Sequence, residues 1–64
     1  MNYEIIVGNV GSVHKGSNYT DALKIFKVYV KYSKQNVGRT GGEDVTLMEN
    51  DEPIKEHYGS LHNI

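Results

Sequence analysis

Four lysines in the middle of the chain recur at spacings of three, four and three residues: Lys24, Lys27, Lys31 and Lys34. On a helix with 100° per residue they fall within about 80° of one another. Such a row of ammonium groups could follow the phosphates of a nucleic acid or contact an acidic protein surface. Lysine lacks the fork of arginine, so nucleic-acid binding here would be independent of base sequence. The alternative interpretation is an ordinary solvated helix face.

Acidic residues gather in the last third of the chain. Residues 43–64 hold six acids and one lysine, whereas residues 1–42 hold six cations and two acids. Four of the acids could present a phosphate-like pattern to a basic cleft, and we take them as candidate partner-binding residues: Glu49, Asp51, Glu52 and Glu56. Arg39, the only arginine, joins them because it lies in a glycine-rich loop that can deform to meet a partner. Solubilising charge and turn chemistry are the alternative explanation.

The residue types argue against catalysis and metal binding. The chain has no cysteine, which excludes disulfides, thiolate metal sites and a cysteine nucleophile. His14, His57 and His62 lack metal-ligand spacing, although His14 and His57 could meet across neighbouring strands. A chain of 64 residues has little room for a pocket of the usual several hundred Å³. We therefore expect no enzyme activity, no cofactor and no metal.

The elements that position these residues begin with a strand over residues 3–7, which is rich in aromatic and β-branched side chains. Two geometries fit the segment that follows. Gly8 and Asn9 could form a hairpin turn, or Gly8 and Gly11 could mark bulges in one long bent strand. We favour the bent strand, because residues 10–13 would make a weak strand of their own.

A helix is expected after the N-cap candidates Ser17 and Asn18, with Asp21 suited to the positive end of its dipole. Its apolar half lies beside the lysines and contains one polar residue, Ser33: the members are Ala22, Leu23, Ile25, Phe26, Tyr29, Val30, Tyr32 and Ser33. Residues 38–42 form a glycine-rich connector. Strands over residues 45–49 and 54–58 then make a hairpin around the turn at residues 50–52.

The expected fold class is α+β, in which one helix packs on a small, mostly antiparallel sheet of three to four strands in the order β(β)-α-β-β. Residues 1–64 form a single domain, with a frayed tail over residues 59–64. One helix can cover only one face of the sheet, so the second face is open to solvent or to a partner. The predicted core is Ile5, Val7, Ala22, Ile25, Phe26, Tyr29, Val45, Leu47 and Ile54.

Membrane insertion and secretion are not expected. The longest apolar run, residues 5–7, is far shorter than the roughly 20 residues of a membrane span, and the N-terminus has no basic region leading into an apolar stretch. We therefore expect a cytoplasmic protein. A domain of this size buries only about 60% of the surface of its unfolded chain, so association with a partner or a second copy is expected to add stability.

Residues 6–11 (IVGNVG), 16–18 (GSN) and 38–47 (GRTGGEDVTL) resemble short reading frames of bacteriophages and mobile elements. Many such proteins inhibit host defences by binding a nuclease or surveillance complex, and anti-CRISPR proteins are among them. The resemblance implies a phage-encoded module, acting in the host cytoplasm, that binds and inhibits a host protein complex such as a CRISPR or other defence nuclease. Two alternatives remain. One is a non-specific nucleic-acid binder using the lysine face, and the other is a small structural or regulatory homodimer.

Overall fold

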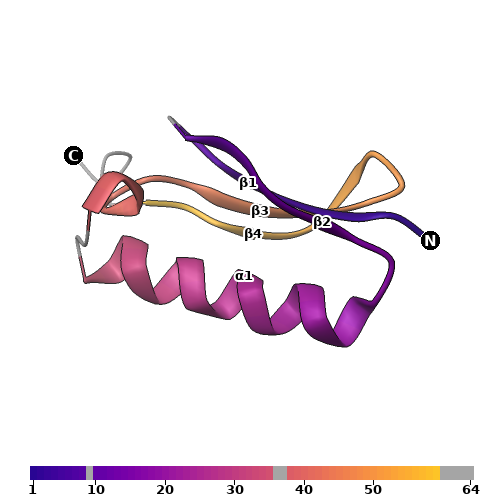
Figure 1. Cartoon of the computed structure of the whole chain (residues 1–64). Helices are drawn as coiled ribbons and strands as arrows, with labels where there is room; N and C mark the ends of the chain where they lie inside the picture. Colours follow the sequence, from indigo (N-terminus) through magenta and orange to yellow (C-terminus); the bar gives the residue numbers. More distant parts are fainter. Residues whose placement is uncertain (9, 36–37, 60–64) are drawn as a thin grey trace.

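The computed structural model describes residues 1–8, 10–35 and 38–59, without the side chain of Arg39. Within these residues one α-helix lies across one face of a four-stranded antiparallel sheet, as expected for the α+β class (Figure 1). The elements in chain order are β1 (Tyr3–Val7), β2 (Gly11–Gly16), α1 (Tyr19–Lys34), the 3-10 turn η1 (Gly38–Thr40), β3 (Val45–Glu49) and β4 (Glu52–His57). Residues 60–64 of the predicted tail lie outside the description.

The segment after β1 is a hairpin, so the bent strand that we favoured is wrong. β2 pairs antiparallel with β1, from Tyr3 opposite Gly16 to Val7 opposite Gly11. The turn is closed by the amide of Val10, which donates to the carbonyl of Val7 over 3.0 Å. Gly11 follows with a φ of 95°, a conformation open mainly to glycine. Strand pairing thus stabilises a segment whose own β-propensity is low.

A β-bulge in the first hairpin adds a side chain to the core. The register shifts between Ile5, which pairs with His14, and Ile6, which pairs with Ser12. Val13 is therefore the extra residue of β2, and it packs against the buried cluster.

The β3–β4 hairpin has a two-residue turn that the N-terminal segment holds in place. Asn50 and Asp51 both have positive φ angles, 48° and 70°, as a type I′ turn requires. The amide of Asn50 donates to the carbonyl of Asn2 over 2.8 Å. The amide of Asn2 donates to Oδ1 of Asn50 over 3.0 Å. These two reciprocal bonds fix the turn against the start of β1.

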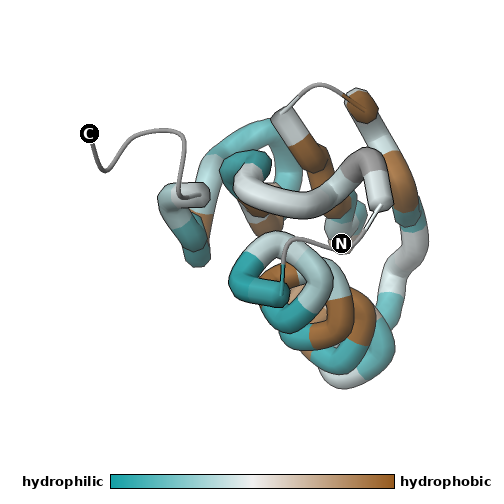
Figure 2. The backbone as a smooth tube through the Cα atoms, turned by 90° about the vertical axis from the view of Figure 1, so that its left-hand side faces the viewer, coloured by the Kyte–Doolittle hydropathy of each residue, from teal (hydrophilic) through white to brown (hydrophobic). Residues whose placement is uncertain are grey.

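Helix α1 begins where the sequence predicts. The side chain of Asn18 accepts a hydrogen bond from the amide of Asp21 over 3.1 Å, which satisfies one free donor of the first turn. The helix packs across β1 with its flanks on β2 and β3, whereas β4 lies beyond it at the sheet edge. Viewed along the helix in Figure 2, α1 occupies one side of the sheet only. No helix among the described residues has the length and apolarity needed to cross a membrane.

The buried core agrees with the prediction at most positions. It consists of Tyr3, Ile5, Val7, Ala22, Phe26, Val45 and Leu47. Tyr3 was not expected there, and Ile25 and Tyr29 are only partly buried at its rim.

Ile54 is a wrong core assignment, since its side chain is 42% exposed. A second bulge, between Leu47 and Met48, causes the difference. Leu47 pairs with Lys55 and Met48 pairs with Pro53, so Ile54 is the extra residue. Lys55 and His57 consequently lie on the same sheet face as Leu47 and Val45, on an edge strand outside the three strands on which the helix mainly packs.

The connector between α1 and β3 is tied down at several points. The hydroxyl of Ser33 donates to the carbonyl of Glu43 over 2.6 Å, and the carbonyl of Ser33 accepts from the amide of Gly42 over 3.1 Å. Asp44 accepts from the amide of Gly59 at Oδ1 over 2.7 Å, and its carbonyl accepts from the amide of Gly8 over 3.0 Å. The glycine-rich segment that the sequence describes as a plain loop thus leads into an anchored junction of helix, sheet and C-terminal strand.

Candidate charged interfaces

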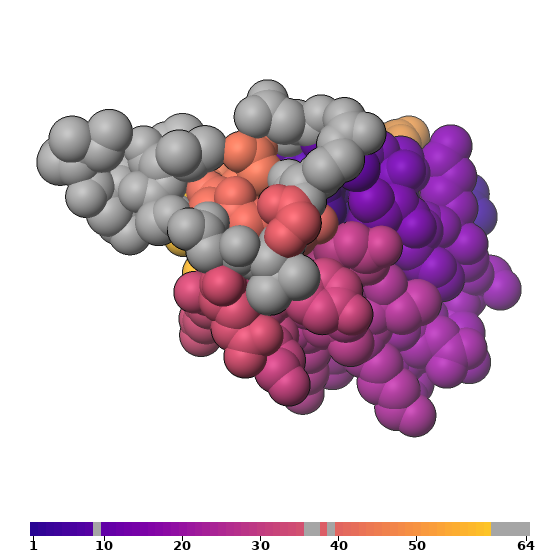
Figure 3. Space-filling model, turned by 60° about the vertical axis from the view of Figure 1, so that its left-hand side comes forward, coloured from indigo at the N-terminus to yellow at the C-terminus, as the bar shows by residue number. Residues whose placement is uncertain are grey.

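The lysine stripe, defined as Lys24, Lys27, Lys31 and Lys34, faces solvent along its whole length. All four side chains are exposed, and they lie opposite the helix face that buries Ala22, Phe26 and Ser33. The ten residues from Lys24 to Lys34 rise about 15 Å along the axis. In the space-filling view the magenta atoms of α1 occupy the lower part of the surface (Figure 3).

Nothing among the described residues neutralises the stripe through an ion pair. The one ion pair between described side chains joins Nζ of Lys15 to Oε2 of Glu4 over 4.0 Å, and it lies on the sheet. No acidic residue occurs between Ala22 and Lys34. The stripe therefore keeps its positive charge available to an external partner.

Three predicted acids come together at the tip of the β3–β4 hairpin, and we call Glu49, Asp51 and Glu52 the acidic turn. Asp51 and Glu52 are exposed, and Glu49 is half-buried. Glu49 pairs directly with Glu52 across the strands, an arrangement that is mildly unfavourable without a partner. The pKa of Tyr3 is raised, mainly by burial and then by the negative charge of Glu49. The turn therefore concentrates negative potential at one end of the sheet.

Glu56 does not belong to the acidic turn. It pairs with Thr46, on the sheet face turned away from the helix, four residues or about 13 Å along the strand from Glu52. Oε2 of Glu56 accepts a hydrogen bond from the hydroxyl of Tyr58 over 3.2 Å. This hydrogen bond, followed by the carboxylate charge, raises the pKa of Tyr58. The predicted acidic surface is thus divided between the hairpin tip and the open face.

Arg39 is the remaining partner-binding candidate. It lies in η1, and its side chain is outside the described part of the structure.

His14 and His57 do not meet across neighbouring strands, an option that the sequence left open. They occupy β2 and β4, the two opposite edges of the sheet, with β1 and β3 between them. His62 lies outside the described residues. Among the residues that are described, no group of three metal-ligating side chains occurs. Nε2 of His14 is buried and has no hydrogen-bond partner within the described part of the chain.

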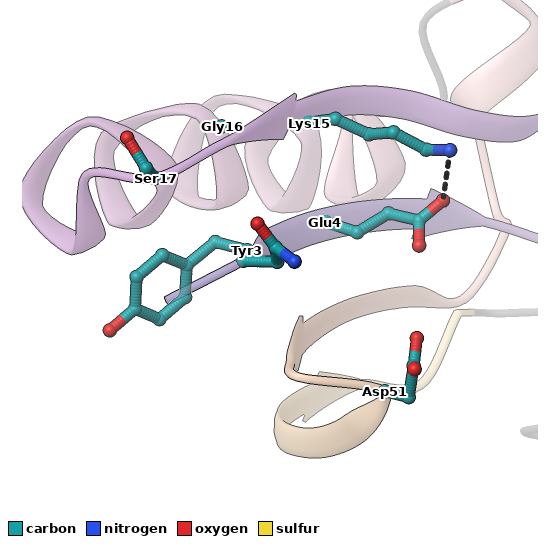
Figure 4. A pocket seen from close by; sticks show the side chains of 7 residues that line it. Tyr3, Glu4, Lys15, Gly16, Ser17 and Asp51 are labelled. Carbon is teal, nitrogen blue, oxygen red and sulfur yellow. Dashed lines mark ion pairs between the residues drawn. The ribbon is translucent and has the colours of Figure 1, made fainter.

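An open depression of about 520 Å³ lies where β1 starts and β2 ends. This volume is in the range of small-molecule sites and exceeds what the chain length led us to expect. Figure 4 shows Glu4 and Lys15 pointing toward one another, with Asp51 standing apart on the hairpin turn. The depression is lined by Asn2, Tyr3, Glu4, Lys15, Gly16, Ser17 and Asp51. The lining offers polar contacts, and its oppositely charged residues Lys15 and Glu4 already form an ion pair with each other.

Comparison of the chain with protein-family models, curated proteins and solved structures yields no match. The function of this protein is therefore inferred from the surfaces of the chain itself.

Proposed function

We propose that this protein is a non-enzymatic, phage-encoded binding module that docks its acidic turn on a basic surface of a host protein complex and inhibits it. The observation that carries the proposal is the position of Glu49, Asp51 and Glu52 on a fixed turn at the end of the sheet. None of the three is ion-paired with a cation among the described residues. A cationic partner surface would relieve the repulsion between Glu49 and Glu52.

The rigidity of the turn favours recognition. Asn50 and Asp51 adopt type I′ geometry, and the reciprocal bonds between Asn2 and Asn50 hold the turn before any partner arrives. A group that is already ordered loses less conformational entropy on binding, so more of the electrostatic attraction remains as affinity. The charges also speed association by steering the encounter.

The chemistry of the acidic turn fits a protein that binds nucleic acid, because a surface that holds phosphates is basic and accepts carboxylates in their place. The resemblance of residues 6–11 and 38–47 to bacteriophage reading frames supports a host defence nuclease or surveillance complex, such as a CRISPR complex, as the class of partner. Occupation of its nucleic-acid cleft would block cleavage without chemistry by the inhibitor. The site of action is then the host cytoplasm.

The test begins with affinity capture from the native host and identification of the captured complex. Nucleic-acid cleavage by the purified complex is then measured with the unmodified protein and with the Glu49→Gln, Asp51→Asn, Glu52→Gln triple variant. We expect the unmodified protein to inhibit cleavage and the variant to lose at least 10-fold in affinity, because the loss of each close charge pair is costly at an interface.

A matched control removes the same number of charges elsewhere through Glu4→Gln, Asp21→Asn and Glu56→Gln. This control should retain inhibition, since its substitutions lie outside the acidic turn. Equal losses in both variants would show that net charge governs binding and would contradict the proposed contact. An acidic-turn variant that inhibits as well as the unmodified protein would do the same.

A further inference from the structure

The outer side of α1 is the strongest feature that the proposed contact does not use. Its four lysines are exposed, and the acidic turn belongs to the sheet layer, at the end of the molecule where α1 begins (Figure 1). The two charged surfaces therefore lie on different layers of the fold. A polyanion on the outer side of α1 would approach from the side opposite the sheet.

The spacing of the stripe suits a chain of phosphates. Successive lysines rise by about 4.5, 6 and 4.5 Å along the helix axis. A nucleic-acid strand in a duplex carries one phosphate per about 3.4 Å, so the 15 Å stripe spans roughly four phosphates. Flexible lysine side chains can adjust to the difference between these repeats.

A membrane surface fits this helix less well. Interfacial helices insert an apolar face between lipid headgroups. Here Ala22 and Phe26, on the apolar face of α1, are buried against the sheet. The outward side has no broad apolar surface to insert, so its attraction to anions is almost purely electrostatic.

Two partly exposed side chains flank the stripe on one side. Val28 is 44% exposed and lies about 40° around the helix from Lys24, and Tyr32 is 39% exposed at about 80°. The ring of Tyr32 is held edge-to-face by Tyr29, with ring centres 5.8 Å apart and planes at 82°. An oriented, accessible aromatic ring beside a row of cations is the combination that single-strand binding proteins use, because bases stack on rings while phosphates contact cations.

We propose that α1 binds single-stranded nucleic acid without sequence preference, with the phosphates on the lysine stripe and a base stacked on Tyr32. The bases of a single strand are free to reach the ring, whereas those of a duplex are paired and stacked. This activity is independent of the acidic turn, so either can fail without the other.

The experiment measures fluorescence anisotropy of a labelled oligothymidylate of about 12 nucleotides, within the usual range of single-strand site sizes. The Lys27→Gln, Lys31→Gln variant is compared with a Lys15→Gln, Lys55→Gln variant of the same net charge. We expect the stripe variant to bind more weakly than the unmodified protein. The slope of its log binding constant against log salt should be smaller in magnitude by about 1.4, or 0.7 for each lost phosphate contact. The control variant should keep the slope of the unmodified protein.

Tyr32 is tested by two substitutions in the same assay. Tyr32→Leu should lower affinity by about 5- to 150-fold, whereas Tyr32→Phe keeps the ring and should bind normally. Circular dichroism confirms that each variant is folded, and the two lysine variants still test the binding surface should the leucine variant fail to fold.

Several results would overturn the proposal. These are no binding at low salt, equal losses in both lysine variants, and affinity for a duplex of the same length equal to that for the single strand. Tighter binding to vesicles rich in phosphatidylserine than to the oligonucleotide would also overturn it, because it would identify lipid headgroups as the preferred anion.

Discussion

Ser33 is the residue whose interpretation changes most between the sequence and the structure. It is the one polar member of the predicted apolar face of α1, and it is buried. Its hydroxyl and its carbonyl both bond to the segment leading into β3, at Glu43 and Gly42. A buried polar group is tolerated when its hydrogen bonds are made, and here they also position the chain that enters the central sheet.

We expect Ser33→Ala to lower the free energy of unfolding by about 1–3 kcal/mol, because the buried carbonyl of Glu43 loses its donor. In a domain of this size each kcal/mol corresponds to a fall in Tm of roughly 4–8 °C. Urea denaturation followed by circular dichroism measures the change. Ser12→Ala, at an exposed position of β2, is the control and should stay within about 0.5 kcal/mol. A Ser33→Ala protein as stable as the control would show that the hydroxyl contributes nothing.

At the scale of elements, the β3–β4 turn combines a structural cost with the charges of the acidic turn. Asn50 tolerates its left-handed conformation, and its side chain also receives the amide of Asn2. Asp51 has a φ of 70°, and its backbone adopts this conformation less readily than that of glycine because Asp51 carries a side chain. The left-handed region costs an ordinary residue about 1–2 kcal/mol. Substitution by glycine removes this cost, but glycine loses more backbone entropy on folding, which offsets about half of the gain.

Asp51→Gly should therefore stabilise the protein by about 0.5–1 kcal/mol, giving the Asn-Gly pair that type I′ turns prefer. Asp51→Asn removes the same charge and keeps a side chain, so the difference between the two variants isolates the backbone effect. Thermal unfolding at one ionic strength gives both values. A glycine variant that melts below the asparagine variant would contradict this account of the turn.

At the scale of the whole molecule, the sheet has two outer strands and one open face. Both outer strands contain a bulge, at Val13 in β2 and at Ile54 in β4, and β4 also contains Pro53. Bulges, proline and charged side chains prevent one edge strand from pairing with another. A homodimer would have to use the open face, where Ile6 and Met48 are only half-buried.

We therefore expect the protein to sediment as a monomer, because two half-buried apolar side chains provide much less surface than a stable dimer interface requires. Sedimentation velocity over a wide range of concentrations measures the state directly. A concentration-dependent dimer would contradict this expectation. If Met48→Lys abolished that dimer, the open face would be its interface.

The sequence by itself determines the α+β class, the helix with its Asn18 cap, the lysine stripe and the strand at residues 45–49. Each of these depends on residues a few positions apart, so periodicity and capping chemistry are enough to predict it. The same local information places Ile5, Val7, Ala22, Phe26, Val45 and Leu47 in the core.

Only the tertiary structure decides how the strands pair, and this pairing sets the remaining features. One extra residue in β4 moves Ile54 out of the core and puts Glu56 on a different surface from the acidic turn. The first hairpin forms because β1 supplies partners for a segment with little β-propensity of its own. A bulge changes which side chains share a face, and its position depends on a partner strand that local sequence does not specify.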